Sequence, residues 1–318
     1  MTVEKPLSAH RKGIKVHKPG QLSLIQDFGR FGLSHLGITQ GGPADEYAYC
    51  WANHLLGNPI NCATLEITLG QADFEVLESC TLAITGANLN ATLDGVPLDN
   101  WSTFNAYPGQ RLKFGLARNG LRAYLAVVGG FQVAPQQGSC ATVVRENMGG
   151  LHSDGKPLNV GDKLHFASHV QQRKQQSLTF RFIPDYNLPL KLRVIESYQS
   201  QSFTKESLQQ LYRSTFKVGQ HVDRMGYRLT DGVVPPPQQE LLSEGIAMGS
   251  IQVPPNGEPI VLLHDRQTIG GYPKVGCVAR IDLPRLAQAK PGQSVQFVKG
   301  DLLGLQDVWC QWARFFGF

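Results

Sequence analysis

Short runs of alternating apolar and polar residues recur along the chain and predict β-strands. The segments RLKF (residues 111–114) and SVQF (residues 294–297) are two examples. Apolar side chains two positions apart in such a run face the same side of a sheet. Turn residues are abundant, because the 318-residue chain holds 34 glycines and 19 prolines. The pattern therefore predicts a mainly β protein with a few short helices.

Three segments instead indicate helices. In residues 43–56 the apolar side chains fall on one face, Asp45 lies in the first turn and Gly57 follows the end. Thr204 is the expected N-cap of a second helix. A third, shorter helix is predicted at residues 282–286.

The turns and strands also indicate an internal duplication. Residues 119–131 and 256–272 share an Asn-Gly turn, an apolar strand and a Gly-Gly-aromatic triplet, and three further pairs of segments match in the same order. Such patterns also occur by chance in β proteins. Because a repeat determines the architecture of a chain, we predict two related halves, residues 14–170 and 178–300, each a closed or nearly closed β-barrel. The amide-rich residues 169–177 are the predicted linker.

The tail, residues 301–318, follows the second half and has its own pattern. It is predicted to form an amphipathic helix, which packs either on its own barrel or on a partner. Its aromatic residues at helical spacing are Trp309, Trp312, Phe315 and Phe316.

Composition and charge argue against a nucleic-acid-binding, a zinc-binding or a membrane protein. The net charge is +5, and the basic residues are scattered apart from residues 10–18 and the pair at 173–174, so a nucleic-acid-binding face is not expected. The six cysteines show no zinc-type spacing, so we expect free thiols and no metal site. Because no apolar run resembles a signal peptide or a membrane span, we expect a soluble, cytoplasmic protein that acts on a small molecule.

Three polar loops that contain glycine are the candidate sites, because no standard nucleotide, metal or nucleophile motif is present. They span residues 26–46, 222–228 and 265–276. In each loop we single out an arginine that could bind a carboxylate or phosphate through two N–H groups, or instead pair with a nearby aspartate. These arginines are Arg30, Arg224 and Arg266. His35 and His264 lie in or beside the loops and could transfer a proton near neutral pH.

Several motifs in these loops and strands resemble those of one family. They are IQDFGRFG, GGPAD, ANHLLGNP, LEITLG and TGANLNATLDG in the first half, and DRMGYRL, LLSEGIAMGSIQVPPNGEPIVLLHDRQTIGGYPKVG and DLPRLAQAKPGQSVQFV in the second. In this order they are similar to the family of 5-oxoprolinase C subunits, also called KipA-like, biotin-dependent carboxyltransferase or allophanate hydrolase subunit 2. The resemblance covers residues 13–299 and leaves the tail outside it.

The resemblance implies a pair of cyclophilin-like β-barrels. It also implies one subunit of the enzyme that opens 5-oxoproline to glutamate with ATP. Its partners would be two further subunits, one KipI-like (the B subunit) and one LamB/YcsF-like (the A subunit). Two alternatives follow from other relatives. The chain could be half of a biotin-dependent carboxyltransferase that acts on a urea-like substrate, or a KipA-like regulator that binds a KipI-like inhibitor of a histidine kinase.

Under the first hypothesis the candidate residues receive roles. Arg266 and Arg224 would stabilise developing negative charge, and His35 or Asp45 would act as the base for water. ATP would bind at a surface that a second polypeptide completes, since the chain carries no nucleotide motif. The remaining residues that we expect to bind or orient the substrate are Arg30, Gln267, Thr268, Gly270, Gly271, Tyr272 and Lys274.

Overall fold

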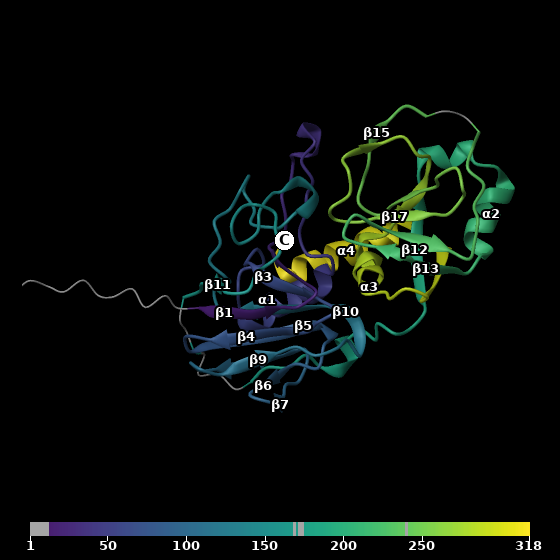
Figure 1. Cartoon of the computed structure of the whole chain (residues 1–318). Coiled ribbons are helices and arrows are strands. Elements are labelled where there is room, and N and C mark those ends of the chain that lie inside the picture. The colour runs from purple at the N-terminus through teal and green to yellow at the C-terminus, as the bar shows by residue number, and fades with distance from the viewer. Residues whose placement is uncertain (1–12, 168–169, 171–174, 239–240) are drawn as a thin grey trace, which may run out of the picture.

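The structure is a computed structural model that describes residues 13–167, 170, 175–238 and 241–318. Figure 1 shows two lobes, the purple to teal first half and the green to yellow second half. Both are built mainly of strands, so the predicted fold class is confirmed. The basic residues 10–12 and most of the predicted linker lie outside the described residues.

Two sheets form the first half and enclose one core. The six-stranded sheet has the order β11 (Lys163–Leu164), β1 (Ile14–Pro19), β4 (Ala72–Val76), β9 (Arg111–Lys113), β6 (Thr92–Leu93) and β7 (Val96–Pro97). The five-stranded sheet has the order β2 (Leu22–Gln26), β3 (Thr64–Thr68), β10 (Asn119–Val127), β5 (Cys80–Asn88) and β8 (Ser102–Ala106). Phe74 from the first sheet and Leu125 from the second are fully buried in the shared core.

Of the two predicted alternatives, a closed or a nearly closed barrel, the first half forms the nearly closed one, because its two sheets enclose one core without joining into a single ring. Loop segments, rather than strands, take the hydrogen bonds at the edges of the five-stranded sheet. On β2 the carbonyl of Ile25 accepts from the N–H of Thr142, and on β8 the N–H of Thr103 donates to the carbonyl of Gln176. Because these edges are occupied, the two sheets remain separate.

The second half closes into a barrel of seven strands. Their order is β12 (Leu190–Glu196), β19 (Lys274–Val278), β16 (Ser250–Gln252), β17 (Ile260–Leu262), β14 (Gly226–Thr230), β13 (Phe216–Val222) and β20 (Ser294–Lys299). The parallel pair β12 and β20 completes the ring. A separate two-stranded sheet, β15 (Glu244–Gly245) with β18 (Ile269–Gly270), lies beside the barrel.

The predicted helices are present. α1 (Glu46–Leu56) starts three residues after the predicted Pro43, because Asp45 is its N-cap and accepts a hydrogen bond from the N–H of Ala48. α2 (Lys205–Arg213) has Thr204 as N-cap, and α3 (Leu283–Ala287) falls where the short helix was expected. The 3₁₀ turns are η1 (Ser34–Leu36), η2 (Val144–Glu146), η3 (Phe180–Phe182), η4 (Tyr198–Ser202) and η5 (Arg280–Asp282).

The tail forms the amphipathic helix α4 (Leu302–Phe316) and packs on its own chain. Phe316 contacts the ring of Trp51 on α1 in the first half. Trp309 stacks on Arg280 of the second half, with 4.2 Å between the guanidinium carbon and the ring centroid. In Figure 1 the yellow helix accordingly runs between the two lobes. α4 therefore helps to hold the halves together.

Candidate functional site

A group of buried charges joins the two halves, and we call it the junction cluster: Glu66, Arg122, Arg224 and Asp265. Glu66 lies in β3 and Arg224 in the loop between β13 and β14, and Nη1 of Arg224 lies 2.7 Å from Oε1 of Glu66. Asp265 accepts from Nε and Nη2 of Arg224 at 2.8 and 3.0 Å. All four side chains are less than a tenth exposed.

These contacts oppose the effect of burial on Glu66 and Arg224, whereas burial still raises the pKa of Asp265. Burial alone would raise the pKa of the Glu66 carboxyl, but Arg224 and Arg122 hold it below its ordinary value. Burial would lower the pKa of Arg224, but Asp265 and Glu66 raise it above the usual range. Nη2 of Arg224 also donates to the carbonyl of Gly42. Each nitrogen of this guanidinium thus binds a protein oxygen, which favours a structural role; its role in substrate binding stays a prediction.

Asp45, at the start of α1, is also buried and hydrogen-bonded by the protein. Its side chain is fully buried and accepts hydrogen bonds from the N–H of Ala48, the hydroxyl of Tyr186 and the amide of Gln288. Burial raises the pKa of Asp45 to about 6. This pKa would suit a general base near neutral pH. However, the three hydrogen bonds enclose the carboxylate within the protein. The geometry therefore favours a helix cap that also joins the halves.

His264 is buried beside another carboxylate of α1. Its Nε2 lies 3.3 Å from Oε1 of Glu46, which also binds the guanidinium of Arg280. Nδ1 of His264 has no hydrogen-bond partner in the described part of the chain. His35, by contrast, lies on the exposed turn η1, and none of the contacts between described residues joins it to Arg266 or Asp45. The structure therefore does not bring the predicted bases to the arginines.

Arg266 and Arg30 are buried without an acidic partner. Arg266 donates to the carbonyls of Ile246 and Leu263 at 3.1 and 3.3 Å, and Arg30 donates to two carbonyls of the first half. Neither forms an ion pair among the described residues, and burial lowers the pKa of both. The hydroxyl of Thr39, in the same loop as Arg30, donates to the carbonyl of Arg266. Asp265 is near enough to both arginines to offset part of the effect of burial on their pKa values. Because no carboxylate among the described residues pairs with them directly, both can still bind an anionic ligand.

The third predicted loop is divided between two environments. Lys274 is buried and lies 2.5 Å from Glu244 in an ion pair. The carbonyl of Thr268 accepts from the N–H of Ile246, and Gly271 is exposed. The ion pair of Lys274 and the hydrogen bond of Thr268 hold β15 and the loop in place. Gln267 and Tyr272 instead line a cavity.

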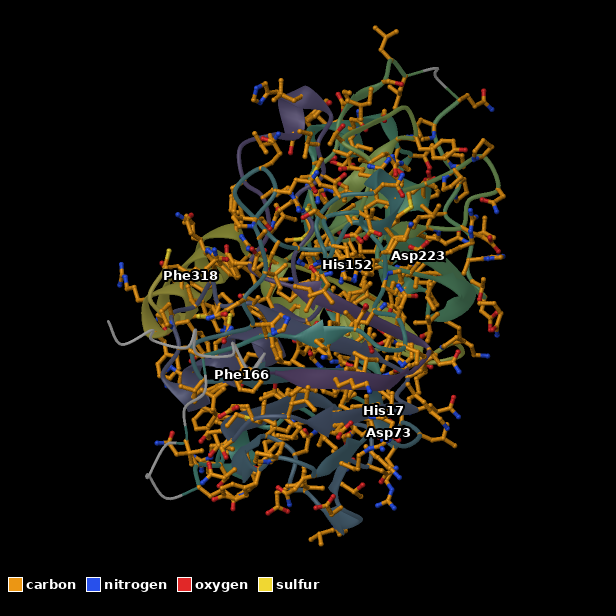
Figure 2. All side chains as sticks on the ribbon, turned by 60° about the vertical axis from the view of Figure 1, so that its left-hand side comes forward. His17, Asp73, His152, Phe166, Asp223 and Phe318 are labelled. Carbon is orange, nitrogen blue, oxygen red and sulfur yellow. The ribbon has the colours of Figure 1, made fainter. Side chains whose placement is uncertain are left out.

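This cavity, which we call the barrel pocket, has a volume of about 500 Å³. It lies on the outer face of the second barrel, because Arg228, Gln252 and Ile260 line it whereas the preceding or following residues Tyr227, Ile251 and Val261 face the core. Asp223 lines it, and Figure 2 shows Asp223 to the right of Phe318, the last residue of the chain. Its volume falls within the range of small-molecule sites, about 300–1,000 Å³. The polar and aromatic residues that line it are Gln220, His221, Asp223, Arg228, Gln252, Gln267 and Tyr272.

Sequence reasoning missed the residues on the strands. Glu66 stands between the buried residues Leu65 and Ile67, and Arg122 is flanked in the same way in β10. A charged residue inside an apolar strand requires a partner, and this signal could have identified both. Gln252 follows Ile251 in β16 and carries a weaker signal of the same kind. His221 and Arg228 lie in strands whose apolar and polar residues alternate, where a polar residue is expected and gives no such signal.

Two kinds of feature are absent from the described residues. None of their helices combines the length and apolar character needed to cross a membrane. No group of three or more His, Cys, Asp or Glu side chains within the described ranges is placed to hold a metal ion.

Comparison with known proteins places this architecture in a family. Residues 36–299 match the carboxyltransferase domain, subdomain A and B. The chain is 36% identical to the C subunit of 5-oxoprolinase from Escherichia coli over 290 residues, 91% of this chain and 92% of that protein. The solved structure of TTHA0988 is 33% identical with a TM-score of 0.82, covering 92% of this chain and 57% of that chain.

A more distant solved structure shares the fold alone. The Kluyveromyces lactis urea carboxylase superposes with a TM-score of 0.89 at 24% identity, covering 98% of this chain but 29% of that chain. The motifs, the fold and these matches agree with the predicted resemblance. The chain belongs to the family of carboxyltransferase domain subdomains A and B that includes the 5-oxoprolinase C subunits.

Proposed function

We propose that the chain is the C subunit of an ATP-dependent 5-oxoprolinase, in which it acts together with a KipI-like and a LamB/YcsF-like subunit. The observation that carries this proposal is the 36% identity to the C subunit of 5-oxoprolinase from Escherichia coli over nine-tenths of both chains. A match over almost the whole length of both chains favours the same place in such an assembly.

The reaction requires both substrate activation and charge stabilisation. A five-membered lactam is a resonance-stabilised amide, and ATP would supply a phosphoryl group that activates its carbonyl oxygen. One 5-oxoproline, one ATP and two waters give glutamate, ADP and phosphate; the ring C–N bond breaks and its nitrogen takes a proton. Negative charge develops on oxygen during this process, and buried cations are suited to stabilise it.

In the proposal Arg266 supplies positive charge beside the barrel pocket, since it forms no ion pair among the described residues and directly precedes Gln267, which lines that pocket. Arg30, whose loop reaches the carbonyl of Arg266 through Thr39, supplies the second cation. Gln267 and Tyr272 orient the lactam in the barrel pocket. The arginine of that pocket, Arg228, is already paired with Glu258 at 3.3 Å. A triphosphate needs more positive charge than this residue provides, so we place most of the ATP contacts on another subunit.

The test reconstitutes the three-protein mixture and then leaves out one protein at a time. This chain and the purified KipI-like and LamB/YcsF-like subunits are mixed with 5-oxoproline and ATP, each protein is omitted in turn, and the release of glutamate is measured. The proposal predicts glutamate only when all three are present. Full activity of the other two proteins alone would show that this chain is dispensable and would overturn the proposal.

A second candidate is biotin-dependent carboxyl transfer. The similarity that favours it is 31% identity over 300 residues to a putative urea carboxylase of Emericella nidulans, of which the match covers 24%. Under this alternative the barrel pocket would hold the ureido ring of biotin. Avidin, which binds biotin, should then abolish activity of the assembled complex, whereas unchanged turnover of 5-oxoproline with avidin present supports the first proposal. A KipA-like regulator would bind the KipI-like protein, and the mixture would release no glutamate.

A further inference from the structure

A row of aromatic rings lies partly exposed at the boundary between the two halves. It starts at Phe31 in the first of the three predicted loops, continues through Phe28 and Phe318, and ends at Trp312 and Trp309 of α4. Successive ring centroids lie 5.7, 4.5, 5.2 and 4.8 Å apart. Phe31 is 55% exposed and Phe318 is 44% exposed. We call these five residues the aromatic row.

The loop that carries Phe31 is anchored at its base by hydrogen bonds. The N–H of Arg30 donates to the carbonyl of Gln40 at 2.7 Å, and the hydroxyl of Thr39 donates to the carbonyl of Arg266 in the second half. Beyond this base no residue of η1 is buried, and in Figure 1 the purple loop extends away from the sheets of the first half. A loop fixed at both ends loses little conformational entropy on binding, so Phe31 is presented in a preformed position.

Exposed rings in a connected row are typical of a protein interface. Contiguous apolar surface on a soluble protein marks an interaction site, and buried aromatic anchors supply much of the binding energy when two proteins associate. The aromatic row also borders the candidate cations, since Phe31 follows Arg30 directly. A protein bound to the row would therefore lie beside Arg30, where the proposed function requires a further subunit to supply the ATP contacts.

The charges beside the row indicate the chemistry of its partner. Arg280 stacks on Trp309 at one end with 4.2 Å between the guanidinium carbon and the ring centroid. Arg145 donates a hydrogen bond to the loop at the other end. The side chains of Arg280 and Arg145 are 31% and 35% exposed, whereas those of their acidic partners, Glu46 and Glu146, are 3% and 15% exposed. Cations thus face the solvent at both ends of the row, and they complement carboxylates on a partner.

We infer that the aromatic row is the surface on which a second subunit docks, and that this subunit contributes an apolar patch bordered by carboxylates. Two comparisons support a protein as the occupant. The relative from Escherichia coli is named as one subunit of 5-oxoprolinase, and the match covers 57% of the TTHA0988 chain, so the rest of that polypeptide lies outside it. The choice of the KipI-like subunit rests on the proposed function, and the regulator hypothesis names the same partner.

The experiment measures binding of the full-length chain to the purified KipI-like subunit by biolayer interferometry. Phe31→Ala and Phe318→Ala, at the two most exposed positions of the row, should each raise Kd at least about thirtyfold, the usual effect of removing an aromatic anchor. Tyr107→Ala, in the turn between β8 and β9 and 51% exposed, is the matched control and should bind like the wild type. Circular dichroism checks that each variant folds. Wild-type affinity in either folded Phe→Ala variant would overturn the inference.

Two further measurements test the chemistry and the identity of the occupant. The association rate should fall as the salt concentration is raised, because salt screens the attraction between the arginines and the partner's carboxylates; an unchanged rate would overturn the acidic border. Analytical ultracentrifugation of the chain alone should show a monomer. A dimer that Phe31→Ala dissociates would assign the row to a second copy of the chain and would overturn the inference, as would binding of the LamB/YcsF-like subunit in place of the KipI-like one.

The inference and the proposed function fail in different ways. If the chain binds the KipI-like subunit through the row but the three-protein mixture releases no glutamate, only the proposed function is wrong. If the mixture is active and Phe31→Ala leaves unchanged the concentration of this chain that gives half-maximal activity, only the inference is wrong.

Discussion

Arg224 and Glu66 belong to different halves of the chain, and Nη1 of Arg224 lies 2.7 Å from Oε1 of Glu66 in a fully buried ion pair. Glu66 also accepts hydrogen bonds from the N–H of Ala44 and the hydroxyl of Tyr124. The position of the loop that carries Arg224 is therefore fixed by a strand of the other half. The two halves should unfold as one cooperative unit.

Loss of Glu66 should be strongly destabilising. Glu66→Ala leaves Arg224 without one of its two carboxylates and Arg122 without the Glu66 carboxylate 3.7 Å from its Nε. Breaking a buried pair in this way costs about 3–5 kcal/mol, which urea unfolding followed by circular dichroism would measure. Lys217→Ala removes the exposed pair with Asp231 and should change little. Equal effects of the two substitutions would show that the junction cluster does not stabilise the fold.

The buried Asp45 predicts a specific pH dependence. Its pKa is about 6 in the folded chain and about 3.9 in an unfolded chain, so the folded state binds the proton more tightly. The stabilisation is complete below pH 4 and is lost as the pH rises through 6. The unfolding free energy of the wild type relative to Asp45→Asn should therefore fall by up to about 3 kcal/mol between pH 4 and 7. Parallel stability curves for the two proteins over this range would contradict the assignment.

The packing of α4 can be tested at its end. Phe316 is 8% exposed and contacts Trp51, His54 and Trp312. Phe316→Ala should weaken the docking of the tail by about 3 kcal/mol, so limited proteolysis should cleave within residues 301–318 much faster. Leu303→Ala, at a position that is 71% exposed, is the matched control and should resist cleavage like the wild type. Equal cleavage of both variants would argue against this packing.

The local patterns of the sequence were sufficient for the elements but not for the contacts between the halves. The helix at residues 46–56 and the second helix after Thr204 could be predicted because an N-cap and a 3.6-residue period act over a few residues. The strands likewise follow a period of two. Each of these signals is contained in the segment that it describes.

The partners of the arginines depend on the tertiary fold. Arg224 was expected either to bind a ligand or to pair with the adjacent Asp223, but Asp223 accepts from the N–H groups of Met225 and Gly226 in its own turn. The actual partners, Asp265 and Glu66, are 41 and 158 residues away. Residues so far apart in the sequence leave no local pattern from which their contact could be predicted. The division of the first half into two sheets also depends on distant segments, so the sequence pattern did not predict it.

Arg266 should be important for catalysis but not for assembly. In the three-protein mixture, Arg266→Ala should lower kcat for glutamate release by about a hundredfold, the usual effect of removing one donor to a developing oxyanion. Size-exclusion chromatography should show the same complex as for the wild type. The exposed Arg118→Ala is the control and should retain full activity. Full turnover by an intact Arg266→Ala complex would exclude Arg266 from the site.

The central claim is that this chain completes a 5-oxoprolinase. The most direct measurement is the rate of ADP release by the purified KipI-like and LamB/YcsF-like subunits, with and without this chain and with and without 5-oxoproline. The account predicts that ADP release depends on 5-oxoproline, matches glutamate release one to one, and occurs only when this chain is present. ADP release that is the same without the chain, or that does not respond to 5-oxoproline, would contradict it.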